Sequence, residues 1–383
     1  MKSVFKKAFA LVLAIAMLTT FAACGGNTAN NTEYVIGLSG PLTGPAAVYG
    51  VAVQNSAQMA IDEINAAGGL DGVMFKLEAM DDKHDATKVS ANFAALMEKG
   101  MQVSLGTVTT APGLEFTKLS NDDKVFFLTP SASGDKIPEF DNGFQMCFAD
   151  GNQGKVAANF VNSLSLSKIG IFYKSDDPYS KGIFDQFKAN LNDGIETVET
   201  VFTAANETDF SAQITQLKDC DFIFMPIYYQ PASVFMTQAK GQIKNNATYY
   251  GCDGFDGLAG QIDLTTIPQE VSMLSHFDAT SSAQATVDFV TKYTTKYGAE
   301  TLNQFGASAY DCVYAIFNAM KELKAAGKDI PVTISAEDLY TLLKDHFTGD
   351  FSYSGVTGTD ITWEDNGYVN KAAVKFTLKE ADK

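Results

Sequence analysis

The chain contains, at residues 34–69, the stretch YVIGLSGPLTGPAAVYGVAVQNSAQMAIDEINAAGG. Its first residues, 34–38, favour a β-strand, and glycines and prolines then predict a loop. From about Tyr49 onward, apolar residues recur at helical spacing until Gly68 and Gly69 end the helix. The loop follows the strand's carboxyl end, where open α/β sheets bind ligands. Its glycine spacing fits neither a dinucleotide fingerprint nor a phosphate-binding P-loop, and an ordinary strand-to-helix turn is the alternative interpretation.

The same alternation of strand and helix continues through most of the chain, which predicts parallel, doubly wound sheets. It restarts in the second half, so we expect two α/β lobes of similar design with a ligand between them. Strands are predicted at 34–38, 74–80, 103–106, 125–129, 168–173, 197–202, 222–226, 248–251 and 271–274, and in the tail at 351–354, 361–364 and 372–378. Helices are predicted from about 49 to 67 and at 86–99, 179–193, 210–218, 282–297, 308–326 and 335–344.

The charge of the chain limits its partners. The net charge of −17 argues against nucleic acid as a partner. The sequence has no arginine, so a bidentate arginine clamp is excluded. Any anionic ligand group must therefore be held by backbone N–H groups, hydroxyls or lysine.

The N-terminus has the pattern of a targeting segment. Lysines precede an apolar run that ends in small residues, which predicts a signal peptide over 1–23. The small residues directly before Cys24 resemble a bacterial lipobox, and this resemblance implies cleavage before Cys24 and lipid attachment to its sulfur. Residues 24–32 would then form a flexible tether. We expect an extracytoplasmic, membrane-anchored lipoprotein. A plain secretory signal is the alternative.

Two other groups of residues could carry chemistry. Asp81, Asp82, His84 and Asp85 could suggest a metal site, but a solvated loop whose Asp85 or Thr87 caps the next helix is favoured, so no metal is expected. The other four cysteines are widely spaced and could be disulfides or buried free thiols. They are Cys147, Cys220, Cys252 and Cys312.

No motif of a catalytic site is found. The three histidines, His84, His276 and His346, are scattered, and none neighbours a plausible serine or cysteine nucleophile in the sequence. A GxSxG elbow is absent. A hydrolase is therefore not favoured.

Several motifs together resemble a known family. They are GPLTGPAAVYG at 40–50, DEINAAGG at 62–69, the strand end at 80–82, LTPSAS at 128–133, DDPYSKG at 176–182, DFIFMPIYYQP at 221–231 and the tail FSYSGVTGTDITWEDNGYV. The chain resembles the type I periplasmic binding proteins that serve ABC importers, in particular the branched-chain (Leu/Ile/Val) amino acid receptors. The resemblance covers nearly all of the chain after the tether.

The resemblance implies a division into lobes. The chain would cross between lobes three times, near 148–152, 275–278 and 348–357. Lobe 1 would comprise 33–147 plus 278–347, and lobe 2 would comprise 150–275 plus 350–383. It also implies a monomer without cofactors that binds a small solute by hinge closure and then meets ABC permease subunits in the membrane.

The resemblance also implies the ligand-binding residues. Hydroxyl and backbone groups of the first lobe would hold the ligand carboxylate, aromatic side chains would enclose its side chain, and an acidic residue of the second lobe would pair with its ammonium. By position these are Tyr49, Thr109, Thr110, Ser131, Ala132, Ser133, Tyr179, Tyr228, Asp253 and Phe305.

This chain departs from the family pattern at two points. The family often has a cysteine pair where this chain has His84 and Thr109, so that disulfide is absent. Asp253 is one methylene shorter than the usual glutamate. We expect a free amino acid ligand, branched-chain aliphatic or aromatic. The alternative ligands are an amide, a urea-like solute or another small polar solute. The alternative role is that of a sensor domain.

Overall fold

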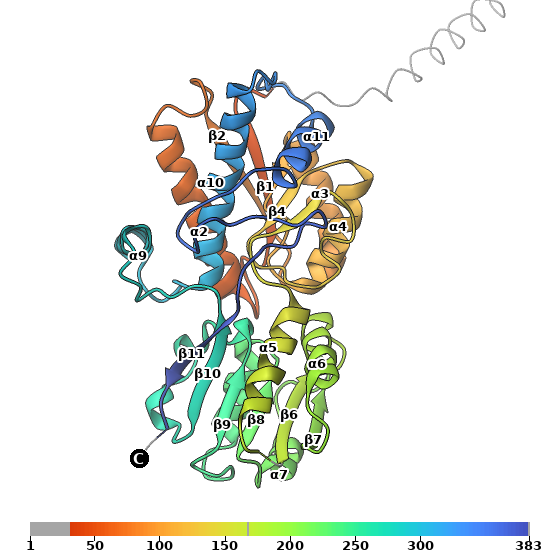
Figure 1. Cartoon of the computed structure of the whole chain (residues 1–383), viewed down its shortest axis with the longest axis vertical. Coiled ribbons are helices and arrows are strands. Elements are labelled where there is room, and N and C mark those ends of the chain that lie inside the picture. The colour runs from red at the N-terminus through yellow and green to blue at the C-terminus, as the bar shows by residue number, and fades with distance from the viewer. Residues whose placement is uncertain (1–30, 167, 382–383) are drawn as a thin grey trace, which may run out of the picture.

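Two β-sheets, each covered by helices on both faces, divide the protein into an upper and a lower lobe in Figure 1. The computed structural model describes residues 31–166 and 168–381. The predicted signal peptide (1–23), Cys24 and the tether as far as residue 30 lie outside these residues. No helix in the described residues has both the length and the apolar character needed to cross a membrane.

The sheet of the first lobe is parallel throughout, with the strand order β2-β1-β3-β4-β5. Every residue of β1 is buried, as expected for a strand with helices on both faces. Its strands are β1 (Tyr34–Gly40), β2 (Phe75–Asp81), β3 (Val103–Ser104), β4 (Phe127–Thr129) and β5 (Gly143–Gln145). Its helices are α2 (Ala47–Ala66), η1 (Ala86–Lys88), α3 (Val89–Glu98), α4 (Thr110–Asp122), α9 (Gln284–Tyr297), α10 (Gln304–Ala325) and α11 (Ala336–Phe347).

The sheet of the second lobe has the order β11-β10-β9-β8-β6-β7, parallel except for the edge strand β11. Its strands are β6 (Lys168–Lys174), β7 (Glu196–Phe202), β8 (Phe222–Met225), β9 (Thr248–Gly251), β10 (Glu270–Ser275) and β11 (Val374–Lys379). Its helices are α5 (Asp150–Ser163), α6 (Pro178–Asn190), α7 (Ser211–Leu217), α8 (Tyr229–Gln238) and the short turns η2 (Asp253–Phe255), η3 (Leu258–Gly260) and η4 (Leu264–Thr266). The predicted fold class, two doubly wound α/β lobes, is confirmed.

The chain passes between the sheets after β5, after β10 and before β11. The first two crossings lie side by side, since the rings of Phe148 and His276 meet edge to face with centroids 5.1 Å apart. The first crossing lies between Gln145 and Asp150, and the second begins after Ser275.

The third crossing comes later than the predicted 348–357. Trp363 donates its indole N–H to the Gln145 carbonyl at 2.7 Å, and its ring packs on Phe347 with centroids 4.7 Å apart. Both partners belong to the first lobe, so the tail as far as Val369 covers that lobe before the chain descends to β11. The tail strands predicted at 351–354 and 361–364 are reduced to isolated bridges, Tyr353 with Ile361 and Trp363 with Val369.

Candidate functional site

The carboxyl ends of the two sheets face each other across a small cavity. Loops after β1, β3 and β4 approach it from the first lobe, and loops after β6, β8 and β9 approach it from the second. Eight of the ten predicted ligand-binding residues line this cavity: Tyr49, Thr110, Ser131, Ser133, Tyr179, Tyr228, Asp253 and Phe305. The structure therefore brings together side chains that lie up to 256 residues apart in the sequence (305 − 49).

The other two predicted residues do not line the cavity. Thr109 turns its hydroxyl to His84, whose Nδ1 lies 2.9 Å from Thr109 Oγ1. Ala132 is held by its backbone, because its N–H donates to Thr129 Oγ1 at 3.0 Å. Val108 lines the cavity instead. The sequence offered no signal for Val108, which resembles any buried apolar residue after a strand.

The first lobe supplies hydroxyl groups. Thr110 is the first residue of α4, so its hydroxyl lies beside the N–H groups that open the helix. The Thr129 hydroxyl donates to the Thr107 carbonyl at 2.8 Å and accepts from the Ser131 N–H at 3.3 Å. This link fixes the two hydroxyl-bearing loops relative to each other. An anion placed here would meet hydroxyls and a helix N-terminus.

The second lobe supplies one acid. Asp253 is 2% exposed, and its Oδ1 accepts from the Tyr179 hydroxyl at 2.7 Å. Burial raises the pKa of Asp253 to about 6, although the hydrogen bonds from Tyr179 and Gln153 oppose that shift. Near neutral pH the carboxyl is therefore ionised, and a buried anion of this kind favours a cationic partner.

Aromatic rings enclose the space between these groups. Tyr49 meets Phe305 edge to face with centroids 4.7 Å apart, and Tyr228 stacks on Tyr179 at 4.5 Å. The Tyr49 hydroxyl also donates to the Gly254 carbonyl of the second lobe at 2.5 Å. The cavity thus has an apolar wall between a hydroxyl side and an acidic side.

Further contacts join the lobes around this cavity. The backbone N–H of Gln304 in the first lobe donates to Asp256 Oδ2 in the second at 2.9 Å. The rings of Tyr49 and Tyr228 approach across the cleft with centroids 5.9 Å apart. The structure therefore shows the lobes in contact, with the cleft closed.

Sequence reasoning missed two residues next to the cavity, Asp150 and Gln153. Both are buried in the first turn of α5, and Gln153 Oε1 accepts from the Asp253 N–H at 3.0 Å. They could have been found only if a helix had been predicted at 150–163, and the sequence there did not indicate one.

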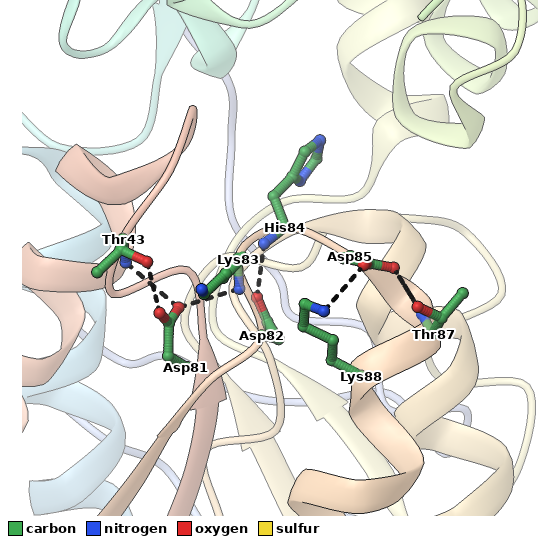
Figure 2. Close-up of polar contacts among 8 residues, drawn as sticks. All are labelled: Thr43, Asp81, Asp82, Lys83, His84, Asp85, Thr87 and Lys88. Carbon is green, nitrogen blue, oxygen red and sulfur yellow. Dashed lines mark hydrogen bonds and ion pairs between the residues drawn. The ribbon is translucent and has the colours of Figure 1, made fainter.

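The loop after β2, in Figure 2, tests the metal interpretation. Asp81 accepts from the N–H and hydroxyl of Thr43, Asp82 accepts from the His84 N–H at 2.9 Å, and Asp85 caps the next helical turn through Thr87. Each carboxylate thus serves its own loop, and the described residues contain no cluster of three or more metal-binding side chains. The predicted cap at Asp85 is confirmed.

His84 and Thr109, which stand where the family often has a cysteine pair, are joined by the 2.9 Å hydrogen bond described above. Burial, followed by the nearby Lys174, lowers the pKa of His84 to about 4, so its ring is neutral near pH 7. In Figure 2 the ring points away from the three carboxylates, and it meets Tyr228 edge to face at 5.2 Å. A hydrogen bond thus joins this loop to the start of α4.

The four cysteines of the described residues are free and buried. This decides between the two interpretations that the sequence left open. They fill the interior as small apolar side chains.

Comparison with known proteins gives matches along almost the whole chain. Residues 33–375 match the model of a family described as periplasmic binding protein. The Leu/Ile/Val-binding protein BraC3 of Rhizobium johnstonii is 29% identical over 324 residues, which are 79% of this chain and 86% of BraC3.

Solved structures match as well. The branched-chain amino acid transporter substrate-binding protein LivJ of Streptococcus pneumoniae, in complex with isoleucine, has a TM-score of 0.78 and 27% identity, covering 91% of this chain and 96% of LivJ. A solute-binding protein of an ABC transporter from R. palustris, in complex with benzoate, has a TM-score of 0.77 and covers 91% of this chain and 94% of its own. At 16% identity it bears on the fold alone.

Proposed function

Because the chain belongs to the periplasmic binding protein family, we propose that it is the solute receptor of an ABC importer and binds a free α-amino acid. The observation that carries this proposal is the composition of the interlobe cavity. Hydroxyls line it from one lobe, a single buried carboxylate lines it from the other, and aromatic rings lie between them.

This composition fits a zwitterion. The hydroxyls of Thr110, Ser131 and Ser133 can donate to the ligand carboxylate, and Asp253 can accept from its ammonium. None of the described residues that line the cavity is basic, so they offer no cationic group that would compete with the ammonium for Asp253. Hydrogen bonds to charged groups contribute about 1.5–3 kcal/mol each, which is consistent with micromolar or tighter binding.

The aromatic wall favours an apolar side chain. Tyr49, Tyr179, Tyr228 and Phe305 offer ring surface to a group that extends from the α-carbon. A branched-chain aliphatic or aromatic side chain fits such a surface. The names of the Rhizobium and Streptococcus relatives point to the branched-chain class.

The alternative ligands are less well supported by this cavity. A neutral amide or urea-like solute would leave the buried Asp253 carboxylate without a cationic partner. A sensor domain would use the same cavity, and the cavity does not distinguish it from a transport receptor.

The family is one of receptors, not enzymes, and one feature supports this role here. His276 Nε2 lies 2.6 Å from Ser308 Oγ, but His276 Nδ1 is buried with no hydrogen-bond partner. The carboxylate that orients the histidine in a catalytic triad is therefore missing from this pair.

The receptor would work outside the cytoplasm, held by a lipid on Cys24 and acting as a monomer. Hinge motion at the three crossings would close the lobes on the ligand and present both of them to the permease. An extracytoplasmic place follows from the family, while the lipid anchor rests on the sequence before Cys24.

Calorimetry of the purified protein without residues 1–24 tests the ligand proposal. The twenty amino acids, simple amides and sugars are titrated separately, and saturable heat with a branched-chain or aromatic amino acid is expected. If no amino acid gives saturable heat, the proposal fails. Tighter binding of an amide than of any amino acid would favour the alternative.

A further inference from the structure

The carboxyl group of Asp150 lies directly against the hydroxyls expected to hold the ligand. Asp150 is 1% exposed, and its Oδ2 lies 3.4 Å from Thr110 Oγ1. Its backbone N–H donates to the Ser133 carbonyl at 2.7 Å. Asp150 belongs to the second lobe and Thr110 and Ser133 to the first, so this contact forms where the lobes meet.

Gln153 distinguishes the two oxygens of this carboxyl. The Asp253 N–H can only donate, so the end of Gln153 that lies 3.0 Å from it must be the amide oxygen. The other end is then the amide NH₂, which lies 3.5 Å from Asp150 Oδ1. Oδ1 therefore accepts from Gln153, and Oδ2 is the oxygen that faces Thr110.

The charge of the site limits ionisation of Asp150. Asp253 interacts with it electrostatically, and two buried carboxylates that interact do not both ionise easily. The titratable groups that interact with Asp150 include Asp135, Cys147, Asp177, Tyr179, Tyr228, Cys252, Asp253 and Tyr368. None of these is basic. Burial, followed by Asp253, raises the pKa of Asp150 well above its usual range.

A threonine hydroxyl has one hydrogen, so its direction depends on its neighbour. If Asp150 were ionised, Thr110 would donate to it and turn its lone pairs towards the ligand carboxylate. If Asp150 carries the proton, Thr110 accepts from Oδ2 and its own hydrogen is available to the ligand. Only the second arrangement attracts a carboxylate.

We propose that Asp150 is a positioning residue which keeps a proton on Oδ2, donates it to Thr110 Oγ1 and so makes the Thr110 hydroxyl a donor to the ligand carboxylate. This inference rests on the proposed function, since it concerns an amino acid ligand. It assigns separate roles to the two buried acids: Asp253 is the anion that meets the ammonium, and Asp150 is the neutral acid that orients a hydroxyl.

Two substitutions of Asp150 test whether its proton or its negative charge matters for ligand binding. In Asp150→Asn the amide oxygen can replace Oδ1 towards Gln153, and the NH₂ can donate to Thr110 as the protonated acid does. Asp150→Ala removes the donor. Titration of L-leucine at pH 7, or of whichever amino acid the panel identifies, is expected to give a Kd at least tenfold weaker for Asp150→Ala. Asp150→Asn should recover the affinity to within about threefold of the unchanged protein.

The proposal would be overturned if Asp150→Asn did not recover the affinity that Asp150→Ala loses. If the negative charge is what matters, Asp150→Asn will bind as weakly as Asp150→Ala. Unchanged affinity in Asp150→Ala would also overturn it. Asp135→Asn is the matched control, because Asp135 accepts from the Gly151 N–H at 2.9 Å beside the same junction but is exposed.

A second measurement tests whether Asp150 acts through the Thr110 hydroxyl or only through the fold. Thr110→Val removes the hydroxyl that Asp150 would orient, so Asp150→Ala should weaken binding less in that background than alone. Equal losses in both backgrounds would contradict the coupling. Melting temperatures identify any variant that does not fold. Failure of the unchanged protein to bind any amino acid would instead refute the proposed function.

Discussion

At the scale of single residues, the binding proposal depends most on Asp253. Among the described residues it is the one carboxylate that lines the cavity, and its Oδ1 already accepts from Tyr179. Asp253→Ala would leave a buried ligand ammonium unpaired, and loss of one partner from a buried charge pair costs about 3–5 kcal/mol. The Kd measured by calorimetry should therefore weaken at least a hundredfold.

Asp85→Asn serves as the control for this variant, because Asp85 is a partly exposed helix cap that does not line the cavity. Its Kd should match that of the unchanged protein. An Asp253→Ala protein that folds and keeps its affinity within twofold would show that the ammonium binds elsewhere.

Eight cavity-lining residues could be predicted from the sequence because the chain resembles a known family, and most of them also follow a strand's carboxyl end. Thr110, Ser131 and Tyr179 all come after predicted strands, so the rule for open α/β sheets placed them at one edge. Thr109 and Ala132 were predicted from the resemblance as well and do not line the cavity. Which of two neighbouring loop residues points inward depends on backbone angles and on contacts such as Thr109 with His84, which the sequence does not show.

At the scale of elements, α5 shows why a helix can escape prediction. Its sequence, DGNQGKVAANFVNS, contains two glycines and several polar residues, and glycine is unfavourable within helices. A Cβ at Gly154 would lie 2.5 Å from the Ile183 carbonyl of α6, so the glycine allows the two helices to pack closely. Tertiary packing thus outweighs local propensity here, and it places Asp150 and Gln153 at the cleft.

The loop after β2 gives a prediction for the pH dependence of stability. Asp82 is buried between the Ser39 hydroxyl at 3.2 Å and the His84 N–H at 2.9 Å, and burial raises its pKa to about 6. The unfolded chain releases this proton near the ordinary pKa of about 4. Between these values the folded state binds more protons, so stability contributed by Asp82 is lost as the pH rises from about 4 to 6.

Asp82→Asn removes this titration and keeps an acceptor for the His84 N–H. Urea unfolding of the ligand-free proteins at pH 4.5 and 6.5 should show a larger loss of unfolding free energy in the unchanged protein, by about 2 kcal/mol. Other buried acids titrate alike in both proteins and cancel in the comparison. Parallel losses in the two proteins would contradict the raised pKa of Asp82.

At the scale of the whole molecule, the two-lobe plan was predictable because the strand–helix pattern starts again in the second half. The position of the third crossing could not be predicted from the sequence. The tail segment before β11 has no strong periodicity, and its attachment depends on Trp363 meeting Phe347 and Gln145. Contacts between residues so distant in sequence are settled by packing, which local patterns do not contain.

The lobes meet through few polar contacts at the cavity, so loss of one of these contacts should weaken closure. The Tyr49 hydroxyl donates to the Gly254 carbonyl across the cleft at 2.5 Å, while the Tyr49 ring still packs on Phe305. Tyr49→Phe keeps the ring and removes this hydrogen bond, which is worth about 1 kcal/mol. If the bond forms only on closure, its loss favours the open state, so the Kd should weaken about fivefold.

Small-angle X-ray scattering should show the radius of gyration falling with ligand in both proteins, with Tyr49→Phe needing more ligand to reach the same value. A ligand-free radius already equal to the bound one in the unchanged protein, or an unaltered Kd in the variant, would show that this contact does not report on closure.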